Sequence, residues 1–432
     1  MIKYFKFHDQ LFSLGDIHVS DFVSDNDLAT GNISDKSPLT LVMDEGIEAP
    51  RLTDVPDAHK MYGKYWYRSG INATMTHELK NIAEDCIASI PTKPGDIFMD
   101  IACNDGTMFK FIPNTFKKVG VDPCDDSYYK ESSQLADLVI QDFFSAAAYK
   151  NSKFGHKKAK IISIIAMFYD LADPLTFLKE IDEVLDDEGL LVIQMSYTPL
   201  MLRQLAFDNI CHEHVYYHTL NSMKKLLSQV GMDVVDCKLN DINGGSFRLY
   251  IRKDKADHTK FRTSPYRDVA KYRVESIEAL EEKERITDPE TYKIFFEKIT
   301  ELKNKTVKFI REEKSKGKTI WGYGASTKGN TLLQWFGLDS SDIDGIAERS
   351  PYKYGLKTVG TNISIYSEDK MREVQPDYLL VLPWHFINEF KIRESEYLNK
   401  GGKFIVPCPS FEIIEGDSPY PCVGEGVEPV EI

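Results

Sequence analysis

The chain runs Ile97-Phe98-Met99-Asp100-Ile101-Ala102-Cys103-Asn104-Asp105-Gly106-Thr107 and then continues with further apolar residues. An apolar run that passes into small and polar residues predicts a buried strand followed by a tight turn. In α/β folds such a turn brings main-chain amides close to a ligand at the carboxyl end of the strand. The carboxylate of Asp100 disfavours a pyrophosphate at this point, but it can bind the ammonium group of an amino acid. The turn therefore predicts a nucleotide-type site that differs from a dinucleotide fingerprint.

Two more acidic residues follow the next two predicted strands. Asp122 comes directly after Lys118–Val121, where ribose hydroxyls would lie, and Asp142 follows Leu138–Ile140 with Phe143 beside it to pack on adenine. Three acids at successive strand ends favour S-adenosylmethionine over NAD; the alternative is that each acid is a helix N-cap, a position that Asp commonly occupies. Ala102 stands where such loops usually have their first glycine. The residues predicted to bind the cofactor are Asp100, Ala102, Asn104, Gly106, Asp122, Asp142 and Phe143.

The pattern of apolar runs predicts an α/β protein with five regions. Residues 76–252 alternate apolar strands with helical patterns, which predicts a domain built on a parallel sheet. A second strand followed by a Gly-rich loop begins at Thr319, so residues 317–411 are expected to form another small α/β domain. The remaining regions are a small, loop-rich N-terminal domain at 1–75, a charged helical connector at 253–316 and a tail at 412–432.

Three helices are expected around these strands. One should follow the turn and contain Met108 to Phe111. A second, from about Pro174 to Leu185, should end before Gly189, as is typical of a stop that contains glycine. A third should begin at Asp288-Pro289-Glu290, where the aspartate caps the helix and the proline takes its first position.

Composition and charge restrict the class of protein. The 432 residues include 53 Lys and Arg against 67 Asp and Glu, which gives a net charge of −14. Such a field repels phosphate backbones and anionic lipids, so neither nucleic acid nor a membrane surface is expected as a partner. The uncharged run from Leu190 to Leu202 is shorter than the roughly 20 residues that span a bilayer, and the N-terminus lacks the apolar stretch of a signal peptide. The seven cysteines form no C-x-x-C pair, which favours reduced thiols and a cytoplasmic protein. No feature of the sequence specifies an oligomeric state.

A second segment with functional residue types is Cys211-His212-Glu213-His214-Val215-Tyr216-Tyr217-His218, which holds three of the ten histidines. As a strand it would place His212 and His214 on one side, and as a helix it would place His214 and His218 on one face. The residue types allow a metal site, an acid/base site in which a neutral imidazole removes a proton, or a hydrogen-bonded structural loop.

Several motifs occur in this chain in combination, and together they resemble the S-adenosylmethionine-dependent sugar C-methyltransferase family of deoxysugar biosynthesis, which acts on nucleotide-linked keto-sugars. The resemblance spans about residues 10–410. It rests on Leu14-Gly15-Asp16, Tyr65-Trp66-Tyr67-Arg68-Ser69, Asp100 to Thr107, Cys211-His212-Glu213-His214, Asn243-Gly244-Gly245-Ser246-Phe247-Arg248, Gly322-Tyr323-Gly324-Ala325-Ser326-Thr327-Lys328-Gly329-Asn330, and Pro376-Asp377-Tyr378 with Trp384.

The resemblance implies a fold of three parts. These are a small N-terminal zinc-binding domain, a central class I methyltransferase (Rossmann-like) domain and a C-terminal Rossmann-like domain that covers the substrate. This chain departs from the family at its N-terminus, because no cysteine precedes Cys86. Zinc is therefore not expected, no catalytic metal is implied, and packing should hold the N-terminal part together.

The resemblance also implies roles for individual residues. His214 would be the general base, with Glu213 and a tyrosine nearby; the tyrosine maps best to Tyr67, with Tyr65 as the alternative. An enolate could be stabilised by that tyrosine or by the second imidazole, His212. The residues implied to hold the nucleotide sugar are Asn243, Ser246, Arg248, Tyr323, Ser326, Lys328 and Asn330.

The leading hypothesis is methylation of a carbon next to a ketone in a nucleotide-linked keto-sugar, with S-adenosylmethionine as the methyl donor. One alternative is an O- or N-methyltransferase that acts on a sugar or glycan precursor. Another is a non-catalytic protein that binds nucleotide sugars. A nicotinamide oxidoreductase is disfavoured because Lys328 and Asn330 break the usual glycine spacing of the second loop.

Overall fold

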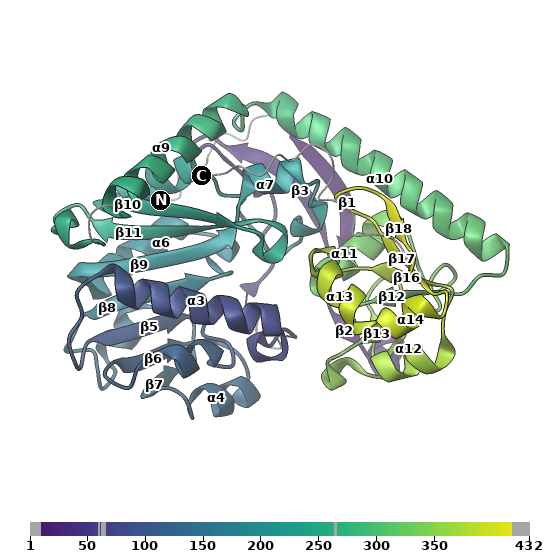
Figure 1. Cartoon of the computed structure of the whole chain (residues 1–432), viewed down its shortest axis with the longest axis horizontal. Helices are drawn as coiled ribbons and strands as arrows, with labels where there is room; N and C mark the ends of the chain where they lie inside the picture. The colour runs from purple at the N-terminus through teal and green to yellow at the C-terminus, as the bar shows by residue number, and fades with distance from the viewer. Residues whose placement is uncertain (1–9, 59–60, 62–65, 263–265, 417–432) are drawn as a thin grey trace.

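A computed structural model of the chain describes residues 10–58, 61, 66–262 and 266–416. Two lobes, each built on its own sheet, lie beneath a pair of long helices (Figure 1). The purple N-terminal strands lie behind the point where these helices meet. Within the described residues, no helix is both long and apolar enough to cross a membrane.

The larger sheet has seven strands in the order β10-β11-β9-β8-β5-β6-β7. Strands β7, β6, β5, β8 and β9 are parallel, whereas β11 runs antiparallel to both of its neighbours. The carboxyl ends of the five parallel strands therefore meet at one edge of the sheet. The bounds are β5 Ile97–Ile101, β6 Lys117–Val121, β7 Leu138–Ile140, β8 Ala159–Ile165, β9 Leu185–Ser196, β10 Met232–Asn240 and β11 Ser246–Lys253. The strand predicted to begin at Ile97 and those predicted at Lys118–Val121 and Leu138–Ile140 are confirmed as β5, β6 and β7.

Helices cover both faces of this sheet, because alternate side chains of each strand point to opposite sides. Phe98 and Ile161 pack under α3 (Ala73–Ser89) on one face, and Met99 and Ile162 belong to the core beneath α6 (Pro174–Val184) on the other. The other helices of this lobe are α4 Asp126–Ser132, α5 Ala146–Lys150, α7 Thr198–Arg203 and α8 Leu220–Ser228.

Two helix predictions differ from the structure. The segment after the turn is only a short 3-10 helix, Thr107–Phe111, because Pro113 disfavours helical backbone at the preceding residue, and Ile112 is extended. The helix α6 does end before Gly189, but the glycine does not terminate it. Leu185 already begins β9, where it pairs with Ala159, so pairing in the sheet ends the helix.

The smaller sheet has six strands in the order β15-β13-β12-β16-β17-β18, of which only β18 is antiparallel. Its strands are β12 Ile320–Tyr323, β13 Gly345–Glu348, β15 Ile365–Ser367, β16 Tyr378–Val381, β17 Lys403–Val406 and β18 Glu412–Ile414. Its helices are α11 Thr327–Phe336, α12 Glu368–Val374, α13 Ile387–Arg393 and α14 Ser395–Asn399. The strand predicted to begin at Thr319 is confirmed as β12.

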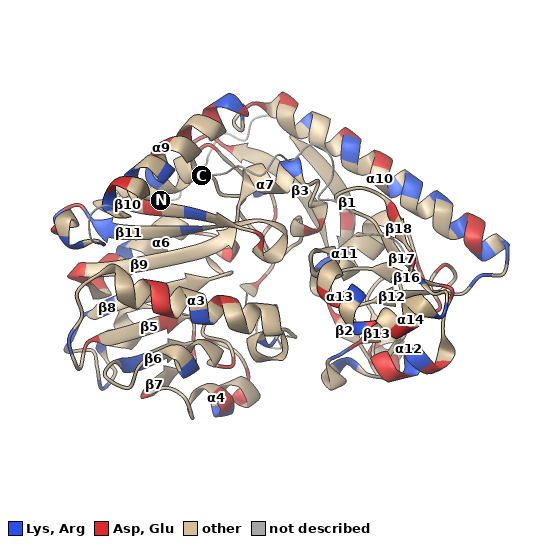
Figure 2. Cartoon of the chain, in the orientation of Figure 1, with Lys and Arg blue, Asp and Glu red and all other residues tan. Residues whose placement is uncertain are grey.

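The two long helices are α9 (Tyr266–Lys283) and α10 (Pro289–Ser315), and α10 begins as predicted. The side chain of Asp288 accepts a hydrogen bond from the amide of Glu290 at 2.9 Å. Charges of both signs alternate along these helices (Figure 2), which fits a solvated outer face. Single 3-10 turns occur at Ser69–Ile71, Phe168–Asp170, Phe207–Asn209, Ile242–Gly244, His258–Lys260, Pro351–Lys353 and Trp384–Phe386.

The N-terminal residues form an antiparallel sheet of three strands, β1 (Phe12–His18), β3 (Lys36–Asp44) and β4 (Ala49–Leu52). Its buried side chains share one continuous core with α10 and the six-stranded sheet. The ring of Phe12 stacks on that of Phe296 at 5.2 Å and lies 5.9 Å from that of Phe295. A short strand, β2 (Phe22–Val23), pairs with β14 (Lys357–Thr358) of the smaller lobe, and the helix α1 spans Asp25–Thr30.

We predict that Phe295→Ala lowers the free energy of unfolding by about 3 kcal/mol, because it empties a buried site between α10 and the N-terminal sheet. Phe295 is 3% exposed, whereas its neighbour Ile294 on the same helix is 45% exposed and serves as the control, Ile294→Ala. Denaturant titration followed by tryptophan fluorescence measures both. Equal losses in the two variants would contradict the shared core.

Candidate functional site

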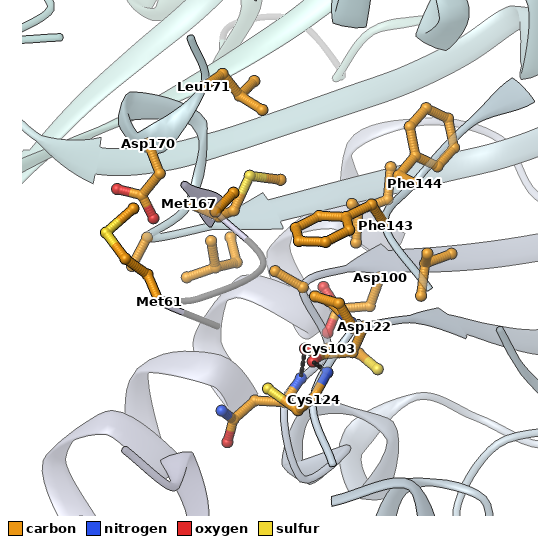
Figure 3. A pocket seen from close by; sticks show the side chains of 18 of the residues that line it. Met61, Asp100, Cys103, Asp122, Cys124, Phe143, Phe144, Met167, Asp170 and Leu171 are labelled. Atoms are coloured by element: carbon orange, nitrogen blue, oxygen red, sulfur yellow. Dashed lines mark hydrogen bonds between the residues drawn. The ribbon is translucent and has the colours of Figure 1, made fainter. Parts of the chain in front are cut away.

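A cavity of about 520 Å³ opens at the carboxyl ends of β5, β6, β7 and β8 (Figure 3). Asp100, Asp122 and Asp142 all line it, so the structure brings together the three acids that the sequence placed at strand ends. Met167 and Asp170 come from the segment after β8 and lie across the cavity from them. The predicted residues Ala102, Asn104 and Phe143 also line the cavity.

The turn after β5 has the backbone that a close approach to a ligand requires. Ala102 and Asn104 both have positive φ, 61° and 52°, in the left-handed region that glycine adopts most easily. Gly106 (φ 75°) does not line the cavity. A Cβ atom on Gly106 would lie 2.8 Å from the Cα of Ser132, so this glycine allows the turn to pack against α4.

The charges of Asp100 and Asp122 interact inside this cavity. Asp100 is buried, and its carboxylate accepts a hydrogen bond from Ser163 Oγ at 2.6 Å. Burial raises the pKa of Asp100 to about 7, with a further contribution from the negative charge of Asp122. Asp122 accepts the amides of Asn104 at 2.7 Å and Cys124 at 2.9 Å, one on each carboxylate oxygen. Each oxygen has a second lone pair, which remains for a ligand hydroxyl.

The rest of the wall is largely apolar. Phe143 and Phe144 follow Asp142, and Val55, Pro56 and Met61 approach from the segment that leaves the N-terminal sheet. The cavity fits S-adenosylmethionine, because it offers one carboxylate for the ammonium group, a second carboxylate for the ribose and aromatic rings for the base. Its volume is in the range of ligand pockets. Within the described ranges, no group of three or more His, Cys, Asp or Glu is placed to hold a metal ion.

His214 lies next to this cavity on the loop that follows the 3-10 turn Phe207–Asn209. Its ring packs against that of Tyr169 with 4.0 Å between centroids, and it forms a hydrogen bond to the main-chain carbonyl of Asn209. Burial moves the pKa of His214 well below its ordinary value, and the positive charge of Lys328 moves it further in the same direction. The imidazole is therefore neutral at physiological pH and able to accept a proton.

The structure corrects the role expected of His212. Its Nε2 lies 3.0 Å from the carbonyl oxygen of Ser37, so the ring faces the N-terminal sheet and not the cavity. The loop is a turn at this point, so neither strand nor helix periodicity places the two imidazoles on one side. His218 is buried against Phe168 and Tyr216, away from the cavity wall, and burial lowers its pKa to about 3.

Glu213 is part of the histidine loop, and Tyr67 lies at the wall of the cofactor cavity. Glu213 accepts a hydrogen bond from Thr327 and lies near Lys328 and Lys353 of the smaller lobe, and burial raises its pKa. Tyr67 lines the cavity with 39% of the residue exposed; desolvation of its hydroxyl and the charge of Asp105 raise its pKa. The alternative, Tyr65, lies outside the described residues.

Two residues expected to hold the substrate are already hydrogen-bonded to other residues of the protein. Arg248 is buried, and its guanidinium donates to Glu78 at 2.7 Å, Gln194 at 2.7 Å and Asn81 at 3.0 Å. The hydroxyl of Tyr323 lies within the smaller lobe, 2.7 Å from Glu394 and 3.1 Å from both Glu368 and Arg393. Both side chains stabilise the fold, because their polar groups are already paired in buried positions.

The other expected substrate residues lie where the two lobes meet. Lys328 Nζ donates to Asn209 Oδ1 at 2.6 Å, next to His214. Ser326 caps α11 by accepting the amide of Gly329 at 2.9 Å. Asn330 donates to the carbonyl of Asp21 at 2.9 Å, and Ser246 to that of Ile242 at 2.8 Å. Asn243 lies in the turn Ile242–Gly244, which contacts Trp384 through Gly244.

Sequence reasoning missed the segment after β8. Tyr169 contacts His214, Asp170 lines the cavity, and Asn209 contacts both His214 and Lys328. The signal was present, because Phe168-Tyr169-Asp170 follows the apolar run Ile161–Ile165 just as Asp122 and Asp142 follow apolar runs.

Comparison with known proteins agrees with this architecture. Residues 71–236 match the model of a methyltransferase domain family, and residues 241–409 match that of the C-methyltransferase C-terminal domain. The C-methyltransferase NovU of Streptomyces niveus is 26% identical over 382 residues, which is 88% of each chain. Among solved structures, the chain is similar to the plantazolicin methyltransferase BpumL (15% identity, 43% of this chain, 88% of that chain, TM-score 0.33). It is also similar to an S-adenosylmethionine-dependent methyltransferase from Clostridium acetobutylicum (13% identity, 41% of this chain, 92% of that chain, TM-score 0.31).

The fold and the two family matches define an S-adenosylmethionine-dependent methyltransferase of the class I type. Within that class the chain is a C-methyltransferase, in which the methyltransferase domain is followed by the C-terminal domain of these enzymes.

We predict that Asp100→Asn weakens binding of S-adenosylmethionine by at least about tenfold, because it removes a charged partner of the ammonium group. In the unaltered protein, affinity should rise from pH 6 to pH 8: the pKa of Asp100 is about 7, and a cationic ligand binds the deprotonated form. The variant should lose this dependence. Calorimetry at several pH values measures both effects.

The control for that measurement is Asp369→Asn, which changes a carboxylate on α12 whose side chain is 87% exposed. It should bind the cofactor as the unaltered protein does. If Asp100→Asn kept both the affinity for S-adenosylmethionine and its pH dependence, Asp100 would not be a residue that binds the cofactor.

We predict that Arg248→Gln lowers the free energy of unfolding by about 3 kcal/mol, because Glu78 then keeps a buried charge without its partner. The KM for the acceptor should stay within a few-fold in the fraction that folds. A rise in KM of tenfold or more at unchanged stability would show that Arg248 binds the substrate.

Proposed function

We propose that the enzyme methylates the carbon next to the ketone of a nucleotide-linked keto-sugar, with His214 as the base. The observation that supports this most strongly is a neutral, buried imidazole whose ring packs against Tyr169, the residue that precedes the cavity-lining Asp170. A hydrogen on a carbon next to a carbonyl is weakly acidic, so its removal near neutral pH needs a placed base and a stabilised enolate.

The surroundings of His214 support this role. The carbonyl of Asn209 holds one ring nitrogen, which leaves the other free to accept a proton. Glu213 lies on the same loop, but its contacts with Thr327 and Lys328 turn it toward the smaller lobe. We assign it to positioning of the loop and keep Tyr67, at the cavity wall, as a donor to the enolate oxygen.

With these groups, every bond that breaks in the proposed reaction is matched by one that forms. His214 takes the proton from the carbon, the C–H electron pair forms the C=C bond of the enolate, and the carbonyl π pair moves to oxygen. S-Adenosylmethionine supplies an electrophilic methyl group when bound. The enolate carbon forms a C–C bond with that methyl group while the bond from the methyl group to sulfur breaks and its electron pair stays on the sulfur, which becomes a neutral thioether. The carbonyl re-forms, and His214 releases its proton to solvent.

A nucleotide-linked substrate also carries phosphate, which must be held despite the net charge of −14. Lys328 supports such binding, since its ammonium lies at the start of α11 and faces the His214 loop. Ser326 and Asn243 lie in the neighbouring turns. We also propose a cytoplasmic location, which is supported by the six described cysteines, all of them free and buried.

We predict that His214→Ala reduces methyl transfer by about 10²- to 10⁴-fold, the contribution typical of a general base. Affinity for S-adenosylmethionine should stay within a few-fold, because His214 does not line the cofactor cavity. Transfer of labelled methyl to a panel of nucleotide-linked keto-sugars, with NMR of the product, measures both the activity and the carbon that is methylated.

The control is His77→Ala, which changes an exposed histidine on α3. It should retain full activity. Near-normal turnover of His214→Ala would overturn the base assignment, and failure of the unaltered enzyme to methylate any keto-sugar of the panel would overturn the proposed substrate class.

A further inference from the structure

The main chain of Tyr169 connects the cofactor cavity with the loop that holds His214. It lies in the 3-10 turn Phe168–Asp170 after β8, and its carbonyl oxygen accepts the amides of Val215 and Tyr216, each at 2.9 Å. The residue after it, Asp170, lines the cofactor cavity. Its side chain is therefore fixed at the boundary between the cavity and the loop that holds His214.

The side chain of Tyr169 faces the predicted base. Its ring contacts that of His214 at 4.0 Å between centroids, with 45° between the ring planes. The residue is only 6% exposed. Burial raises the pKa of its hydroxyl well above the ordinary value, and the nearby groups Asp170, Glu213 and Tyr67 act in the same direction, so the phenol keeps its proton.

The hydroxyl of Tyr169 also differs from those of three other buried tyrosines. Tyr197 donates to Glu281 at 2.7 Å, Tyr292 to the carbonyl of Ile286 at 2.8 Å, and Tyr149 to that of Lys157 at 2.8 Å. In the part of the chain that the structure describes, no hydrogen bond is made by the Tyr169 hydroxyl, and its oxygen is not among the fully buried atoms that lack a partner, as that of Tyr217 is. The hydroxyl is therefore accessible beside the imidazole of His214, where a ligand oxygen can take the place of water.

We propose that the hydroxyl of Tyr169 donates a hydrogen bond to the ketone oxygen of the substrate while His214 removes the neighbouring proton. This inference rests on the proposed function and adds a catalytic residue to it. In this step the C–H bond breaks and an N–H bond forms on His214. The C–H pair becomes the C=C bond, and the carbonyl π pair becomes the oxygen lone pair that accepts the Tyr169 proton in a hydrogen bond. No oxidant or further reactant is needed.

Tyr67 and Tyr169 together form a pair of phenols at this position. The two hydroxyls are close enough for the charge of one to affect the pKa of the other, and Tyr67 lines the cavity. Two protonated donors aimed at one oxygen are the arrangement that stabilises a developing negative charge. Tyr169 takes the position that the sequence assigned to His212, whose ring faces Ser37.

The test compares Tyr169→Phe with Tyr149→Phe. Phenylalanine keeps the ring that packs on His214 and removes only the hydroxyl, so a merely structural contribution of the ring is preserved. Tyr149→Phe removes a buried hydroxyl of the same lobe that bonds to the protein, away from His214. The measurement is exchange of the substrate α-hydrogen with D₂O, followed by NMR without S-adenosylmethionine, on the keto-sugar of the panel that the unaltered enzyme methylates fastest.

We expect Tyr169→Phe to slow this exchange by about 10²- to 10³-fold, as the loss of one oxyanion donor does. Its thermal midpoint and its affinity for S-adenosylmethionine should match those of the unaltered protein. Tyr149→Phe loses the bond to Lys157 and should have a lower midpoint, yet exchange at the unaltered rate. Unaltered exchange in Tyr169→Phe, with exchange lost in His214→Ala, would overturn this inference and leave the proposed function standing. If the slower exchange came with a lower thermal midpoint or weaker cofactor binding, the role would be structural. If the unaltered enzyme neither exchanged nor methylated any keto-sugar, both proposals would fail.

Discussion

Two main-chain hydrogen bonds from Val215 and Tyr216 to the carbonyl of Tyr169 connect the cofactor cavity with the histidine loop. The turn that carries Tyr169 is fixed because it follows β8, which lies near the middle of the seven-stranded sheet. The histidine loop has no regular helix or strand of its own, and main-chain hydrogen bonds to Pro50 and Leu52 of β4 hold it from the other side. Together these bonds give the proposed base and the cofactor cavity a fixed geometry, on which catalysis by placed groups depends.

The smaller lobe completes the site by contacting the same loop from the other side. Lys328 binds the side chain of Asn209, and Trp384 donates to Asp208 at 3.0 Å. Arg68 also links the lobes, since its guanidinium lies 3.9 Å from the ring centre of Tyr128 and 5.1 Å from that of Tyr352. These contacts bring a positive charge next to a neutral imidazole, which helps to keep it unprotonated.

The N-terminal sheet shows how packing holds a part of the chain that contains no cysteine before Cys86. Phe12 and its neighbours are buried against α10 and the smaller lobe, and β2 pairs with β14 across the two parts. The same sheet binds His212 through the carbonyl of Ser37. It thereby contributes to the position of the histidine loop as well as to the core.

The sequence by itself determined the strands, the long capped helix α10 and the three acids at the strand ends, because apolar runs, Asp-Pro capping and end-of-strand turns are local signals. Motifs that occur together in the sequence also pointed to His214 as the proposed base. Only the tertiary structure decided which polar side chains are already paired within the protein. Arg248 and Tyr323 resembled ligand-binding groups in the sequence, yet Glu78 and Glu394, distant in the chain, already pair with them. The end of α6 and the orientation of His212 were likewise decided by contacts with distant strands. Tyr169 became visible only when β8 and the histidine loop were placed side by side, because the availability of a polar group depends on neighbours that local sequence does not contain.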